Sequence, residues 1–402
     1  MTVIAKPQVD HEFLVKPSHD ELARQTYASN LRMYTLATIG GGMRTVYDRR
    51  VKPAFEKANG RPPKDEHDVR RVMMKDPYCR TWSTMMRAAQ EMVWESVVPT
   101  VERAQPELNA RIENVMSMPG RNKMGSVSLD PTIVKPRYAT AVDIHLMPGN
   151  YETERTPNDA SQGAFYDRGV YVYQGGMGGD NCHGIGMSLA TFIKRKFPDL
   201  KPQKILDVGC TVGHNLVPFV DLFPEAEIHG VDMSAPVMRY AHARAEAMGK
   251  AVHYHQMNAE NMAFPDNTFD VVTSVILFHE TSRTALRKII KECRRVLKPG
   301  GLMLHMELPR TAGMDPYDAF YLDWDAYYNN EPFYQAYTST DMKEVIVGAG
   351  FAPDKYVEYL IPDLVWCDPA EFDAAVRGDL ERGNALARWG ESIKWSTYGA
   401  WK

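Results

Sequence analysis

Short apolar runs alternate with amphipathic stretches through the second half of the chain. The apolar runs predict strands at 204–208, 227–231, 252–257, 269–275 and 301–306. Apolar residues at helical spacing predict helices between them, at 214–222, 235–248 and 283–297. Alternation at these lengths is typical of a parallel sheet with helices on both faces. We therefore predict an α/β core.

The first third of the chain has a helical pattern instead. Apolar positions recur at helical spacing over 20–51, 65–74 and 78–97, and Pro99 and Pro106 are expected to limit the third helix. Trp82 and Trp94 fall on its apolar face, where core packing is the expected role and a pocket wall is the alternative. Residues 1–162 are thus predicted to form a mainly helical N-terminal domain, with 1–18 as a docked arm or a frayed tail.

A glycine-rich segment at 163–183 precedes the first predicted core strand. Its glycines indicate mobile backbone or backbone close to a ligand. We expect this segment to act as a lid over a ligand, with a plain linker as the alternative. Tyr171 and Tyr173 are its candidate substrate contacts.

An aromatic segment at 310–340 interrupts the second half of the chain. It carries nine aromatic side chains, among them Trp324 and Tyr328. Such a segment can cap an apolar substrate or pack against another domain. We take the cap as the expectation, with Trp324 and Tyr328 as substrate contacts, and assign 311–402 to a third unit that also holds the last core strands. A helix is expected at 368–388, followed by an aromatic terminus that docks.

A turn between the strand at 204–208 and the next helix carries the main candidate site. Its pattern is Asp207-x-Gly209-x-x-x-Gly213, and Asp232 ends the following apolar run, nineteen residues after Gly213. Glycines let the backbone approach a ligand closely, and an acid at the tip of a second strand can accept both hydroxyls of a ribose. A dinucleotide would need G-x-G-x-x-G, and Asp207 would repel its pyrophosphate but attract an ammonium group.

This pattern resembles motif I of the class I S-adenosylmethionine (SAM) methyltransferases, with Thr211 in place of the middle glycine. The stretches 258–272, 277–280 and 294–301 resemble later motifs of the same family, in the right order. The resemblance covers about residues 198–351 and is strongest to the small-molecule type, such as ubiquinone/menaquinone-biosynthesis methyltransferases. It implies an α/β, Rossmann-like fold of seven strands with the last antiparallel, a SAM-binding core at 163–310, and SAM as the methyl donor, with S-adenosylhomocysteine as its product.

The resemblance also implies roles for individual residues. Asp207 would bind the methionyl ammonium, and Asp232 would bind the ribose. Backbone contacts to the methionyl part would come from Gly209, Cys210 and Gly213. The adenine would lie among Met233, Asn258, Ala259 and Glu260.

Polar residues that follow two further strands are candidates for catalysis. His279 is expected beside the transferred methyl as a general base oriented by Glu280, with a packing or helix-capping role as the alternative. His305 with Glu307 is a second candidate pair. The acceptor atom, whether O, N or C, stays open. A binding protein without methyltransferase activity, and a protein or nucleic-acid methyltransferase, are the alternative functions.

Composition narrows the classes of partner. The formal net charge is −4, so no basic field favours nucleic acid or an acidic membrane. The five cysteines form no C-x-x-C pair, which disfavours a disulfide framework or a zinc site. The chain shows neither a signal peptide nor a run near the roughly 18 apolar residues of a membrane span. We expect a cytoplasmic protein with a small-molecule acceptor, no metal, no nucleic-acid or membrane partner, and homodimer formation left open.

Overall fold

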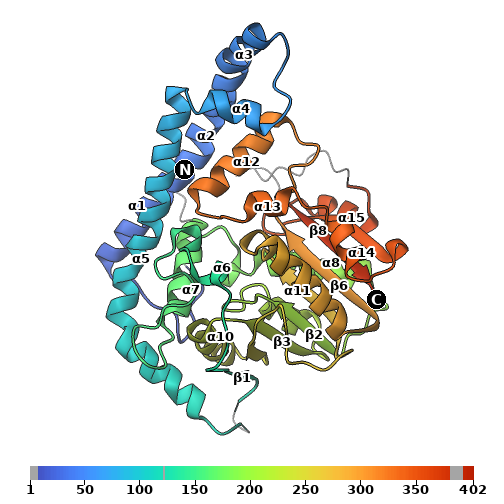
Figure 1. Cartoon of the computed structure of the whole chain (residues 1–402). Helices are drawn as coiled ribbons and strands as arrows, with labels where there is room; N and C mark the ends of the chain where they lie inside the picture. The colour runs from blue at the N-terminus through green and yellow to red at the C-terminus, as the bar shows by residue number, and fades with distance from the viewer. Residues whose placement is uncertain (1–7, 121–122, 381–392) are drawn as a thin grey trace.

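An eight-stranded sheet forms the centre of the molecule, and long helices extend from it on one side (Figure 1). The computed structural model describes residues 8–120, 123–380 and 393–402. The strand order is β1-β4-β3-β2-β5-β6-β8-β7. The strands are β1 (Ser126–Ser128), β2 (Lys204–Val208), β3 (Glu227–Asp232), β4 (His253–Gln256), β5 (Phe269–Val275), β6 (Leu297–Glu307), β7 (Tyr356–Pro362) and β8 (Lys394–Trp401).

The predicted α/β core is confirmed. All five expected core strands form, and β8 pairs antiparallel with both β6 and β7 while the other strand pairs are parallel. The expected antiparallel strand is therefore supplied by the aromatic terminus, which docks by entering the sheet. The short strand β1 pairs with β4 and adds an eighth strand to the expected seven.

Helices cover both faces of this sheet. Leu206, Val272 and Met303 point to the face covered by α11 (Arg283–Val296) and α14 (Met342–Gly348). Their sequence neighbours Ile205, Val271 and Leu302 point to the other face, as the period of two requires. That other face is covered by α7 (Ser161–Tyr173), α8 (Gly184–Lys196), α9 (Val217–Leu222) and α10 (Ala235–Ala247).

The N-terminal region is mainly helical, as predicted. A capping box of Ser18 and Glu21 starts α1 (His19–Tyr34). The chain continues helical through η1 (Thr35–Ile39), α2 (Gly40–Val46), η2 (Tyr47–Val51) and α3 (Lys52–Asn59), and α4 (Glu66–Met73) follows. Of the expected arm, residues 8–18 are docked, because Phe13 and Val15 are buried; residues 1–7 lie outside the described part.

The prediction that Pro99 and Pro106 limit the third helix was wrong. α5 (Pro77–Ser117) runs on through Pro99 and Pro106. A proline inside a helix costs one backbone hydrogen bond. Here the apolar side chains around both prolines, including Val97, Val101 and Leu108, are buried in the shared core, and this packing holds the helix together.

The aromatic segment forms α12 (Pro316–Tyr328) and α13 (Tyr334–Thr338). Figure 1 shows α12 lying among α2, α4 and α5, away from the sheet. Further short elements are α6 (Arg137–Thr140), η4 (Ile144–Leu146), η5 (Asp180–Cys182), η6 (Phe278–Glu280), η7 (Pro353–Lys355) and α15 (Pro369–Arg377). The helix expected at 368–388 is thus shorter, and its second part falls largely on residues 381–392, which are not described.

Candidate functional site

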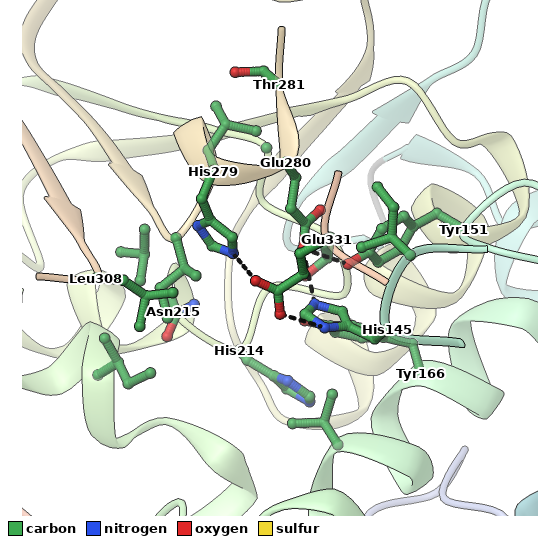
Figure 2. Close-up of a pocket in the computed structure, with 18 of the residues that line it drawn as sticks. His145, Tyr151, Tyr166, His214, Asn215, His279, Glu280, Thr281, Leu308 and Glu331 are labelled. Carbon is green, nitrogen blue, oxygen red and sulfur yellow. Dashed lines mark hydrogen bonds and ion pairs between the residues drawn. The ribbon is translucent and has the colours of Figure 1, made fainter. Parts of the chain in front are cut away.

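One cavity of about 370 Å³ opens where β2, β3 and β5 end. It has two parts, which we name by their residues. The loop half is lined by Gly209, Thr211, Asp232, Met233, Asn258 and Ala259. The histidine–glutamate half is lined by His145, Tyr151, His279, Glu280, Asn329 and Glu331. Figure 2 shows Glu331 between the rings of His145 and His279.

The turn after β2 has the backbone that its glycines allow. Gly209 and Gly213 have φ angles of +74° and +80°, and a side chain at Gly213 would meet the hydroxyl of Tyr254. Thr211, at the position where the family has glycine, also has a positive φ, of +44°. Its backbone N–H donates to Asp232 at 3.1 Å. This contact ties the backbone of the turn to the end of the neighbouring strand.

Asp232 is the carboxylate of the loop half. It accepts from the N–H groups of Thr211 and Ser234, at 3.1 and 3.0 Å. Burial raises the pKa of Asp232 to about 6, with Glu152 adding to the effect. A carboxylate has more lone pairs than these two donors use, so it can also accept from a ligand's hydroxyls.

Three predicted ligand contacts lie behind the cavity wall. Asp207 is buried and accepts from the Thr273 hydroxyl at 2.9 Å. Burial raises its pKa to about 7. Neither Asp207 nor Cys210 or Gly213 is among the lining residues. They support the turn from behind, because the side chains of a buried strand and a tight loop pack into the core.

The predicted adenine residues divide in the same way. Met233, Asn258 and Ala259 line the cavity. Glu260 instead accepts from the Tyr138 hydroxyl at 3.0 Å and pairs with Lys288 at 2.9 Å, outside the lining. Asn258 uses its side-chain oxygen to accept from the N–H of Glu260, at 2.9 Å.

His279 lines the cavity as expected, but its partner is not the one expected. Its Nδ1 lies 2.9 Å from Glu307 Oε2, whereas the adjacent Glu280 turns to His145. The reason is geometric: β5 and β6 are neighbours, so Glu307 at the end of β6 lies beside the residues that follow β5. His279 Nε2 is buried and makes no hydrogen bond.

His305 was wrongly paired with Glu307. In the register of β5 and β6 His305 lies opposite Ser274, and its Nδ1 is 2.8 Å from that hydroxyl. It is fully buried, outside the cavity lining, and burial lowers its pKa to about 3. It is a core histidine rather than a member of the site.

Glu331 joins three distant parts of the chain. Its Oε1 lies 3.1 Å from His145 Nδ1, and its Oε2 lies 3.9 Å from His279 Nε2. His145 Nε2 lies 2.9 Å from Glu280, which also accepts from the Tyr151 hydroxyl at 3.1 Å. The sequence analysis missed His145, Tyr151 and Glu331, because they stand outside the recognisable motifs.

These contacts set the protonation states of the histidine–glutamate half. Burial alone would lower the pKa of His279, but Glu307, Glu331 and Glu280 outweigh it and raise the pKa to about 9. Burial likewise opposes the charge on His145, yet Glu280 and Glu331 raise its pKa to about 10. Glu331 keeps a lowered pKa despite its burial, chiefly through His145. At neutral pH both rings are therefore imidazolium and Glu331 is ionised.

The aromatic substrate contacts predicted from sequence are only partly brought to the cavity. Tyr173 lines it, whereas Tyr171 lines a smaller neighbouring pocket. Trp324 donates to Ser83 at 2.6 Å and packs with Tyr328 against the N-terminal helices. The packing alternative therefore describes these two side chains. The same helix reaches the cavity with Leu322 and Ala326 instead, and Asn329 directly after it also lines the cavity.

No cluster of three or more His, Cys, Asp or Glu residues in the described ranges has the geometry of a metal site. The same part of the chain contains no helix with both the length and the apolar surface needed to cross a bilayer.

A sequence profile described as "Methyltransferase domain" matches residues 205–301. This match spans β2, the glycine turn, Asp232 and His279. This match supports the class I SAM-dependent methyltransferase superfamily for the core of the chain. The match includes the loop half of the cavity and His279, whereas His145 and Glu331 of the other half lie outside the matched residues.

Curated relatives of this core include two methyltransferases. The demethylmenaquinone methyltransferase of Thermus thermophilus is 33% identical over 127 residues, which are 32% of this chain and 55% of that protein. The ubiquinone/menaquinone biosynthesis C-methyltransferase of Pasteurella multocida is 34% identical over 124 residues, 30% of this chain and 45% of that protein. The chain thus spans about half the length of these relatives or less.

Among solved structures, phosphoethanolamine N-methyltransferase 2 of Haemonchus contortus, in complex with phosphomonomethylethanolamine and S-adenosylhomocysteine, is 20% identical. The likeness covers 59% of this chain and 58% of that one, with a TM-score of 0.41.

Proposed function

We propose that this chain transfers a methyl group from SAM to a small apolar or aromatic acceptor in the histidine–glutamate half of the cavity. The observation that carries the proposal is the continuity of the cavity. A buried carboxylate at the tip of β3, Asp232, and a polar cluster after β5, around His279, line the same space. If the nucleoside part of SAM binds in the loop half, the sulfur of SAM can face the histidine–glutamate half.

The residues of the loop half fit such a nucleoside. Asp232 has unused lone pairs for two ribose hydroxyls, and Met233, Asn258 and Ala259 would flank the base. The positive φ angles of Gly209 and Gly213 let the turn pass close to the ligand. When bound, SAM supplies an electrophilic methyl on a sulfonium.

The residues of the histidine–glutamate half bind and orient the acceptor. Because the pKa of His279 is raised to about 9, its ring carries two protons at neutral pH. One proton is donated to Glu307 through Nδ1, whereas Nε2–H makes no hydrogen bond, with Glu331 Oε2 3.9 Å away, and can donate to the acceptor. A donor of this kind favours an acceptor that carries negative charge on oxygen or on an enolate. His279 can act as the predicted general base only where the pH approaches its raised pKa.

Apolar and aromatic side chains of the cavity favour an acceptor whose ring or chain is apolar apart from the reacting group. Tyr173, Trp94 and Leu322 line it, together with Leu308 and Tyr334. Burial of apolar acceptor surface against them contributes about 25 cal/mol per Å².

We also propose the division into a helical N-terminal domain at 1–162, a core at 163–310 and a C-terminal unit at 311–402.

Calorimetric titration tests this function. S-adenosylhomocysteine should bind with measurable heat and raise the melting temperature, and NAD should do neither. Methyl-labelled SAM should then label members of a panel of phenols and enolic rings in preference to charged amines. A response to NAD without one to S-adenosylhomocysteine would contradict the proposal, and binding without transfer to any acceptor class would favour the binding-protein alternative.

A further inference from the structure

A buried carboxylate outside the proposed reaction, Asp167 on α7, connects four segments of the chain. Its side chain is fully buried, and it lies 2.7 Å from His214 Nε2 and 3.0 Å from His11 Nε2. It also accepts from the Tyr240 hydroxyl at 2.8 Å and from Arg244 Nε at 3.3 Å. The glycine turn, the N-terminal arm and α10 therefore meet at one acidic group on α7.

The charge of Asp167 is balanced within this cluster. Burial opposes its ionisation, but Arg244, His11 and His214 hold its pKa well below the ordinary range. Burial lowers the pKa of His214, so that ring is neutral at neutral pH. Since an ionised carboxylate can only accept, the proton of His214 lies on Nε2, and Nδ1 is left as a hydrogen-bond acceptor.

His214 is placed to use that acceptor on a ligand. It follows Gly213 directly, lines the cavity, and stacks on Tyr166 with ring centroids 5.7 Å apart. Tyr166 is also hydrogen-bonded to the side chain of Thr211. The ring is therefore fixed from two sides, by Asp167 and by Tyr166.

The order of the strands indicates which part of the cofactor it faces. Across the sheet edge the order is β4, β3, β2, β5. The proposed base and ribose contacts follow β4 and β3, so the amino-acid part of the cofactor falls beside the turn that follows β2. Asp207, the expected ammonium ligand, lies behind the wall there, whereas His214 is on it.

We propose that His214 Nδ1 accepts a hydrogen bond from the ammonium group of the bound cofactor, and that Asp167 is the positioning residue that holds this imidazole in place. This inference rests on the proposed function and assigns a specific contact to it. Through His11 the docked N-terminal arm becomes a supporting part of the cofactor site.

Two ligands that differ only at the amino-acid end test the inference in the full chain. S-adenosylhomocysteine carries the ammonium and carboxylate, and 5′-methylthioadenosine has the same nucleoside and thioether without them. His214→Phe keeps a ring against Tyr166 and removes both nitrogens. It should weaken S-adenosylhomocysteine binding at least about tenfold, as expected for one hydrogen bond to a charged group, and leave methylthioadenosine within about twofold.

Asp167→Asn should give the same selective loss, and Asp232→Asn is the matched control that should weaken both ligands alike. Thermal unfolding shows whether each variant folds. If Asp167→Asn does not fold, His214→Phe alone decides the test. An equal loss of both ligands in His214→Phe, or no loss of either, would overturn the inference while the proposed function stands. A wild-type chain that binds neither ligand would overturn the proposed function itself.

Discussion

The two halves of the cavity differ in where their residues come from. The loop half is assembled from strand ends that follow one another in the core, so its main residues stand within about fifty positions, from Gly209 to Ala259. The histidine–glutamate half combines η4, the turn after β5 and the segment after α12, and its members His145 and Glu331 stand 186 positions apart in the sequence. A local motif specifies the first half, whereas tertiary packing specifies the second.

The largest expected effect comes from a substitution that alters the histidine–glutamate half alone. Glu331→Ala leaves two buried imidazolium rings without their shared carboxylate. It should lower the free energy of unfolding by about 3–5 kcal/mol. It should also lower the pKa of His145 and His279, as followed by NMR titration. S-adenosylhomocysteine affinity should stay within about twofold. A change confined to cofactor affinity would contradict the separation of the halves.

Trp324→Ala sharpens the comparison at the edge of the acceptor site. Trp324 is buried among the N-terminal helices and bonds Ser83, so its removal leaves a cavity in that core. We expect a loss of about 3–5 kcal/mol in the free energy of unfolding, measured by denaturant titration. S-adenosylhomocysteine affinity in the folded variant should be unchanged. Normal stability would show that the side chain packs elsewhere.

Asp232→Ala affects the loop half. A buried ribose would lose its charged acceptor, so S-adenosylhomocysteine should bind about 1–3 kcal/mol more weakly in calorimetry. The pKa of His279 should not move, since its partners lie in the other half. An unchanged dissociation constant in a folded variant would remove Asp232 from the ribose site.

The smallest effect is a pH dependence of stability. His145 and His279 have pKa values raised to about 10 and about 9. A raised pKa in the folded state stabilises below the unfolded value, near 6.5, and this contribution is lost as the pH rises through the folded value. Urea unfolding at rising pH should show this alkaline loss. In Glu331→Gln the pKa values of both histidines should be less raised, so the loss of unfolding free energy at alkaline pH should be smaller. An equal loss in the wild type and the variant would contradict the role given to Glu331.

Of the predicted cofactor residues, five line the cavity, and each stands at a strand end or turn that a local pattern marks: Gly209, Asp232, Met233, Asn258 and Ala259. An apolar run followed by glycines and an acid at the next strand end places Gly209 and Asp232 without knowledge of the tertiary fold. The same local reasoning misassigned partners in the other half. It paired His279 with its neighbour Glu280, and His305 with Glu307, whereas strand register brings Glu307 to His279 and Ser274 to His305.

Other differences have the same origin. Nothing in the sequence around His145 or Glu331 marks a site, because their role depends on α12 packing against the N-terminal helices. The aromatic residues of 310–340 were correctly identified as unusual. Composition alone could not separate the face that packs, with Trp324, from the face that lines the cavity, with Leu322 and Ala326.

A crystal structure with S-adenosylhomocysteine bound tests the central claim most directly, namely that one cavity holds the cofactor and the acceptor in its two halves. We predict that both ribose hydroxyls lie within hydrogen-bond distance of Asp232, with the sulfur facing the space in front of His279 and Glu331. A ligand whose sulfur points away from those two residues, or whose ribose lies outside the reach of Asp232, would contradict the account.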